Sequence, residues 1–210
     1  MKPRKLLISI LNYGNHQSSY LKMIEDEFRN YKEFEVTILH GETKLSHRTD
    51  LYNKIEEYDL FLYVENDIRI KEDAILAYLK YDWEIPINNC IGFIRYENRP
   101  NSDIKYIPDQ NPNLARGCEI IENILEINGK KYFTLLNVHQ GCWLLTRKKL
   151  KEAAKSLNFY SLPHPAKLEC AASGLFSNWQ NWGGTVRPIF PIDPPRLRKI
   201  ADTPSTKQIL

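Results

Sequence analysis

Short apolar runs separated by amphipathic stretches dominate the first half of the chain. Residues 5–11 are almost entirely apolar, with charge before them and a polar turn after them, which predicts a fully buried strand. Runs of the same kind predict further strands at residues 34–39, 59–64 and 91–94.

The segments between these runs carry apolar residues at helical spacing. One predicted helix, which Ser18 or Ser19 can cap, has an apolar face formed by Leu21, Ile24 and Phe28. A later predicted helix has an apolar face formed by Ile75, Leu76 and Leu79. Residues 51–58 and 148–157 are also predicted to be helical. Strand–helix–strand alternation requires right-handed crossovers, so we expect an α/β fold with a mixed, mostly parallel sheet flanked by helices.

The second half of the chain is less regular. Residues 98–113 form a polar, proline-bearing stretch that is long for a connector and is a candidate substrate lid. Asn128-Gly129, between two strand-like runs, predicts an added antiparallel hairpin. We expect one domain over residues 1–200 and a poorly ordered tail, or a linker to further domains, over residues 201–210.

The composition excludes several classes of protein. With 29 Lys and Arg against 26 Asp and Glu, the net charge of +3 is too small to indicate a nucleic-acid partner. Hydrophobic residues make up 42% of the chain, which is too many for a disordered protein. No segment approaches the ~18 consecutive apolar residues of a membrane span, and the N-terminus does not resemble a signal peptide.

The four cysteines are widely spaced and form no CxxC pair. A zinc site, a redox dithiol and a disulfide framework are therefore not expected. We expect reduced, largely buried thiols in a cytoplasmic protein.

The candidate chemistry is concentrated where the third strand ends. Glu65-Asn66-Asp67 follows Val64 directly, and ligands of open α/β sheets bind beyond the carboxyl ends of the strands. Two carboxylates that converge in a tight turn can hold Mg²⁺ or Mn²⁺ and leave positions open for phosphate oxygens. The alternative is that Asp67 caps a helix beginning near Lys71 and that Glu65 is a solvated turn residue.

This arrangement resembles the GT-A class of nucleotide-sugar glycosyltransferases. The resemblance rests on the parallel first half, the acidic Glu-x-Asp of Glu65 and Asp67, and a late segment at residues 138–147. It implies a Rossmann-like GT-A fold with a nucleotide-binding half (1–97) and an acceptor-binding half (98–200). It also implies Mn²⁺ or Mg²⁺ as cofactor, a donor such as a UDP-sugar, and a glycan or glycoprotein acceptor. The compact size is also similar to the small capsid-glycosylating transferase domains of large algal viruses.

The resemblance assigns donor-binding roles to several residues. Asn12 and Tyr13, after the first strand, would contact the base or ribose, and Asn66 lies within the acidic motif. Arg48 would reach the phosphates or the base, or else is a surface residue paired with Asp50. The turn and strand that would line the sugar pocket contribute Gly141, Cys142 and Trp143.

The acceptor side of the site is expected late in the chain. Glu169 is the candidate general base for an inverting reaction, although Cys170 stands where the class has a second acidic residue. His139, next to the sugar-binding turn, is a second candidate. Without an acidic group near the acceptor, a retaining reaction is favoured. The aromatic residues Trp179 and Trp182 would pack against an acceptor sugar.

Two other functions remain open at this point. A sugar nucleotidyltransferase would use a related sheet and a metal, but the loop after the first strand has one glycine and no Arg or Lys. A carbohydrate-binding module would use the tryptophan-rich segment and leave the α/β half unexplained. The lack of GxGxxG and GxxxxGK[ST] motifs argues against a dinucleotide enzyme and a P-loop NTPase.

Overall fold

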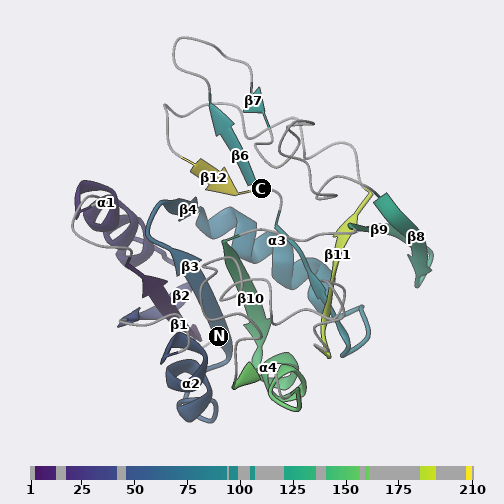
Figure 1. Ribbon diagram of the computed structural model, residues 1–210, viewed down its shortest axis with the longest axis horizontal. Helices are drawn as coiled ribbons and strands as arrows, with labels where there is room; N and C mark the ends of the chain where they lie inside the picture. Colours follow the sequence, from purple (N-terminus) through teal and green to yellow (C-terminus); the bar gives the residue numbers. More distant parts are fainter. Residues whose placement is uncertain are drawn as a thin grey trace.

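A computed structural model describes much of the chain (Figure 1). The described residues are 3–12, 18–41, 46–93, 95–98, 105–106, 121–135, 141–156, 159–160, 185–192 and 207–209.

Four strands form the central sheet, in the order β10-β3-β1-β2. They are β1 (Arg4–Leu11), β2 (Phe34–Gly41), β3 (Leu60–Glu65) and β10 (Cys142–Thr146). The first three are parallel to one another, and β10 runs antiparallel to β3. The predicted strands at 5–11, 34–39 and 59–64 are confirmed. The central strands β1 and β3 are buried on both faces, as their apolar runs predict, whereas the edge strand β2 is mostly half-buried.

Helices cover both faces of this sheet (Figure 1). They are α1 (Ser18–Arg29), α2 (Ser46–Asn53), α3 (Glu72–Asp82) and α4 (Arg147–Ala153). Because successive side chains of a strand point to opposite faces, each strand contributes to two hydrophobic clusters. The protein is therefore mixed α/β, with a mixed-orientation sheet between helices.

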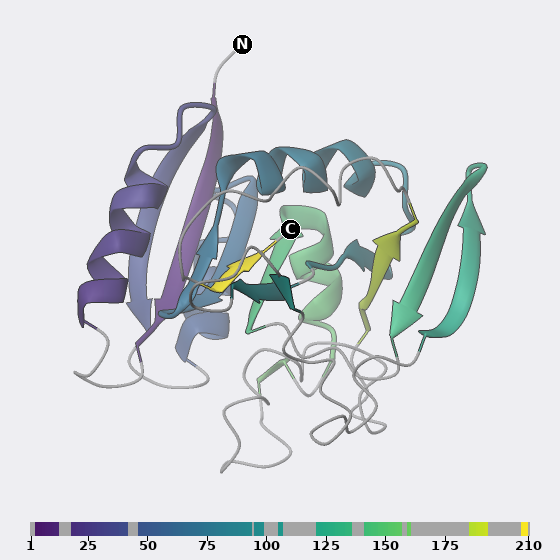
Figure 2. The same ribbon diagram turned by 90° about the horizontal axis from the view of Figure 1, so that it is seen from above.

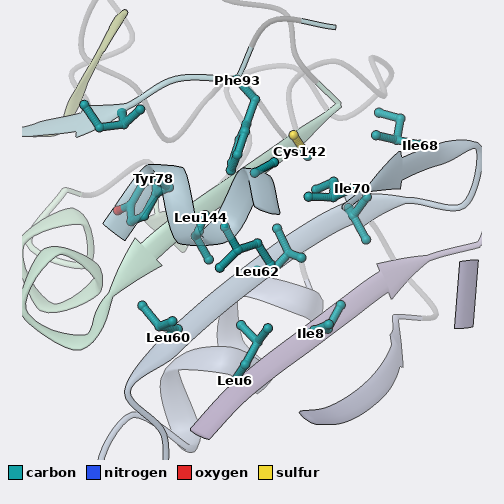
Figure 3. Packing of buried hydrophobic residues seen from close by; sticks show 14 of the residues in the cluster. Leu6, Ile8, Leu60, Leu62, Ile68, Ile70, Tyr78, Phe93, Cys142 and Leu144 are labelled. Atoms are coloured by element: carbon teal, nitrogen blue, oxygen red, sulfur yellow. The ribbon is translucent and has the colours of Figure 1, made fainter. Parts of the chain in front are cut away.

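The first cluster lies between the sheet and helices α1 and α3. Leu6 and Ile8 of β1, Leu60 and Leu62 of β3, and Cys142 and Leu144 of β10 point to this face, where Tyr78 of α3 packs (Figure 3). The second cluster lies on the opposite face. It joins Leu7, Phe61 and Leu145 of the sheet to Leu51 of α2 and Leu150 of α4.

A second sheet has the order β5-β11-β9-β8. It consists of β5 (Asn89–Ile91), β8 (Ile121–Ile127), β9 (Lys130–Leu135) and β11 (Arg187–Pro191). The β8–β9 hairpin lies at the opposite end of the molecule from α1 (Figure 2). Asn128 and Gly129 both have positive φ, 53° and 75°, as a two-residue hairpin turn requires, so the predicted hairpin is confirmed.

A third sheet, of short strands, has the order β4-β12-β6-β7. It consists of β4 (Ile68–Ile70), β6 (Arg95–Asn98), β7 (Lys105–Tyr106) and β12 (Lys207–Ile209). Within the expected tail, the segment Lys207–Ile209 pairs with β4 on one side and β6 on the other. A strand of three residues is too short to leave a periodic signal in the sequence.

Three other predictions from the sequence are corrected. The second helix begins at Ser46 instead of at residue 51. Its apolar pattern does not predict this start, because the buried residues of its first turn are the polar His47 and Arg48. In α3, Leu76 is 38% exposed, and the buried residues are Ala74, Ile75, Tyr78 and Asp82. The strand predicted at 91–94 spans Asn89–Ile91.

Among the helices in the described part of the chain, none combines the length and apolar character that crossing a bilayer demands.

A buried ion pair joins α4 to the end of α3. Nζ of Lys149 lies 2.6 Å from Oδ1 of Asp82, and the two side chains are only 5% and 4% exposed. Nζ also donates to the Asp82 carbonyl oxygen at 3.3 Å. Burial lowers the pKa of Lys149, and the Asp82 carboxylate opposes this effect. Burial raises the pKa of the Cys90 thiol, since the thiolate is the charged form. Cys90 and Cys142 are both buried, and neither forms a disulfide with another described residue.

We expect Asp82→Asn to lower the free energy of unfolding by about 3 kcal/mol, because it leaves a buried ammonium without its partner charge. Replacing both groups, as Asp82→Leu with Lys149→Met, should cost much less than the sum of the single substitutions. Urea unfolding measures these changes. The exposed pair of Lys54 and Glu57, 3.9 Å apart, provides a control, and Glu57→Gln should have little effect. Additive effects of the Asp82 and Lys149 substitutions would contradict this interpretation.

Candidate functional site

The carboxyl ends of the parallel strands meet at one edge of the central sheet. Leu11 of β1 is in register with Glu65 of β3 on one side and Gly41 of β2 on the other. Asn12 and Asn66 follow directly, so two residues predicted from the sequence to bind the donor lie beside each other at this edge. This is the edge at which open α/β sheets bind ligands.

Asn66 is the centre of this arrangement. Its backbone N–H donates to the Leu11 carbonyl at 3.1 Å, and its side-chain Nδ2 donates to Oδ1 of Asn12 at 2.6 Å. Asn66 is fully buried, whereas Asn12 is exposed. The turn that carries Glu65 and Asp67 is therefore joined to the end of β1 by one backbone and one side-chain hydrogen bond.

Gly141 brings β10 against the same turn. The Glu65 N–H donates to the Gly141 carbonyl at 2.9 Å, and Gly141 has a φ of +60°. A Cβ at Gly141 would lie 2.4 Å from Cδ1 of Ile68 and 2.8 Å from Oε2 of Glu65. Any other residue at this position would have a strained backbone and would displace the ends of the Ile68 and Glu65 side chains.

Asp67 is not at the N-cap position of α3. It occupies the two-residue turn between β3 and β4, and α3 begins only at Glu72. The N-cap residue of α3 is Lys71, which makes no side-chain capping bond. Glu65 and Asp67 are both half-buried at the sheet edge.

Cys142 and Trp143 are interior residues. Cys142 is 0% and Trp143 1% exposed, and they belong to the clusters on opposite faces of the sheet. The Trp143 ring stacks on Tyr63 with centroids 5.8 Å apart. Of the three residues expected to line a sugar pocket, only Gly141 has its backbone at the acidic turn.

Arg48 is fully buried in the first turn of α2, so the alternative of a surface residue paired with Asp50 is wrong. The sequence analysis missed its neighbour, His47, which is also fully buried. The His47 ring lies 4.1 Å from that of Tyr63, centroid to centroid, and 6.3 Å from that of Trp143. These residues form an aromatic stack beneath α2. No periodicity could have revealed it, because His47 lies in a stretch that reads as polar.

Several predicted site residues lie outside the described residues. They are Tyr13, His139, Glu169, Trp179 and Trp182. Their roles remain predictions from the sequence.

Among the described residues, no group of three or more His, Cys, Asp and Glu side chains is arranged to hold a metal ion. Glu65 and Asp67 each place a carboxylate-bearing residue at this edge, which is fewer than such a group requires. Comparisons with protein-family models, with curated proteins and with solved structures found no match to this chain.

We expect Gly141→Ala to destabilise the protein by about 2–4 kcal/mol, because it adds a left-handed alanine and a contact with Ile68. Gly129→Ala is the matched control, since Gly129 also has a positive φ but a Cβ there would meet nothing within 4 Å. The free energy of unfolding of Gly129→Ala should fall by only about 1 kcal/mol. Urea unfolding compares the two, and equal losses would show that the Gly141 contacts are unimportant.

Proposed function

We propose that the protein is a metal-dependent glycosyltransferase with a GT-A-like fold, which transfers a sugar from a nucleoside diphosphate, UDP in particular, to a glycan or glycoprotein. The observation that carries this proposal is the hydrogen-bonded junction of Asn12, at the end of β1, with the acidic turn after β3. A candidate base-binding residue and two acidic residues thus lie together at the carboxyl ends of the parallel strands β1 and β3.

The acidic turn supports binding of a divalent cation. Glu65 and Asp67 offer carboxylate oxygens, which Mn²⁺ and Mg²⁺ prefer, and neither residue is at the N-cap position of α3. Two protein ligands leave coordination positions for phosphate oxygens. When bound, the cation would neutralise the diphosphate that leaves the sugar.

The chain's own residues have distinct roles in this proposal. Glu65 and Asp67 hold the cation, and Gly141 allows β10 to approach the Glu65 carboxylate. Glu169 is proposed to take the proton of the acceptor hydroxyl, and His139 to lie beside the donor sugar. Three predicted site residues are buried in the core, namely Arg48, Cys142 and Trp143. Their role would be indirect, because their packing would keep the carboxyl ends of the strands in position.

We expect the protein to bind UDP only in the presence of Mn²⁺ or Mg²⁺, and Asp67→Asn to abolish this binding. The substitution keeps the size of the side chain but removes the charge that holds the cation. Isothermal titration with UDP, GDP and CMP, each with and without Mn²⁺, measures the effect.

Asp73→Asn is the matched control, because Asp73 is an exposed carboxylate in the first turn of α3. This variant should bind as the wild type does. Equal binding by the wild type and Asp67→Asn, or no nucleotide binding under any condition, would refute the proposed function.

We expect Glu169→Gln to bind UDP with unchanged affinity but to transfer sugar at least about 100-fold more slowly, because a glutamine cannot accept the acceptor's proton. Product formation from UDP-sugars, followed with a panel of glycan acceptors, measures the rate. A normal transfer rate would exclude Glu169 as the base and favour a retaining reaction.

A further inference from the structure

The amide of Asn12 has a defined orientation. Its Oδ1 accepts a hydrogen bond from Nδ2 of Asn66 at 2.6 Å. A side-chain amide has an acceptor at one end and two N–H donors at the other. The oxygen of Asn12 is engaged by the buried Asn66, and within the described part of the chain its Nδ2 donates to no other residue. The exposed Asn12 side chain therefore offers N–H donors to a ligand.

The environment of Asn66 favours this orientation over the reverse. Oδ1 of Asn66 is buried and has no hydrogen-bond partner among the described residues. In the reverse orientation, Oδ1 of Asn66 would accept a hydrogen bond from Nδ2 of Asn12. The buried NH₂ group of Asn66 would then lose its acceptor, Oδ1 of Asn12. Unpaired buried N–H groups are rarer in proteins than under-satisfied carbonyl oxygens. The hydrogen bond from the Asn66 backbone N–H to the Leu11 carbonyl oxygen also fixes the backbone position from which the Asn66 side chain extends.

We propose that Asn66 is a positioning residue that sets Asn12 to offer N–H donors outward, and that this selects uracil over cytosine as the base of the bound nucleotide. The inference rests on the proposed function and specifies its nucleotide. Uracil has a carbonyl oxygen at C4, which accepts a hydrogen bond, whereas cytosine has an amino group there, which donates one. An N–H donor directed at this position can form a hydrogen bond with O4 of uracil, but it faces another donor, the amino group, in cytosine.

This arrangement also connects base selection to the metal-binding turn. Asn66 lies between Glu65 and Asp67 in the sequence, so the residue that orients Asn12 is part of the acidic turn itself. A shift of the turn would move the Asn12 amide with it. The base and the diphosphate are thereby recognised by one hydrogen-bonded unit.

The test compares the affinities for UDP and CDP in the presence of Mn²⁺, by isothermal titration. Both ligands carry the same ribose and diphosphate, so their ratio reports only the base. We expect the wild type to bind UDP about tenfold or more tightly than CDP, because cytosine leaves the donor of Asn12 unpaired.

Two substitutions should alter this ratio in a way that a merely structural role would not. In Asn12→Asp, one carboxylate oxygen accepts from Asn66 and the other faces the ligand, so the preference should shift toward CDP. In Asn66→Asp, the new carboxylate can only accept, so Asn12 turns its Nδ2 inward and its oxygen outward, which again shifts the preference toward CDP. Asn12→Asp changes an exposed residue and keeps the test valid if Asn66→Asp fails to fold.

Asn123→Asp is the matched control, because Asn123 is exposed on the remote β8–β9 hairpin (Figure 2). Its UDP-to-CDP ratio should equal that of the wild type. Equal affinities or a CDP preference in the wild type, or an unchanged ratio in Asn12→Asp, would overturn this inference. In that case Mn²⁺-dependent binding lost in Asp67→Asn would leave the proposed function intact, whereas the absence of any nucleotide binding would refute both.

Discussion

The parallel pairing of β1 with β3 is the constraint on which the rest of the structure depends. Residues 6–11 of β1 and 60–64 of β3 are all buried and almost all apolar, so these segments are stable only where helices cover both faces of the sheet. Their register sets Leu11 opposite Glu65, and the chain then continues into Asn12 and Asn66. The junction of Asn12 with the acidic turn is thus a direct consequence of how the hydrophobic core aligns two strands.

Buried polar groups surround this apolar framework and decide its details. At one end of β3, Asn66 joins the acidic turn to β1. Toward the start of α4, Lys149 and Asp82 fix this helix against the end of α3. Each such group must find a partner to offset its lost hydration, so it specifies geometry more sharply than apolar contacts do.

The sequence predicted the strands of the central sheet and the hairpin because those signals are local. An apolar run identifies a buried strand, and Asn128-Gly129 identifies a turn with positive φ. It misplaced the start of α2, because His47 and Arg48 are polar residues on a buried face. It also missed β12, whose pairing with β4 depends on backbone groups distant in the chain.

That Glu65, Asn66 and Asp67 follow a buried strand is evident from the amino-acid sequence, because an apolar run and its polar end are properties of neighbouring residues. Which of these side chains faces inward, and which residues it contacts, depends on how distant segments pack. The register of β1 and β3, and the left-handed glycine at the start of β10, are set by contacts between distant segments. For that reason the orientation of Asn12, on which the proposed base selection depends, could not be inferred from the sequence alone.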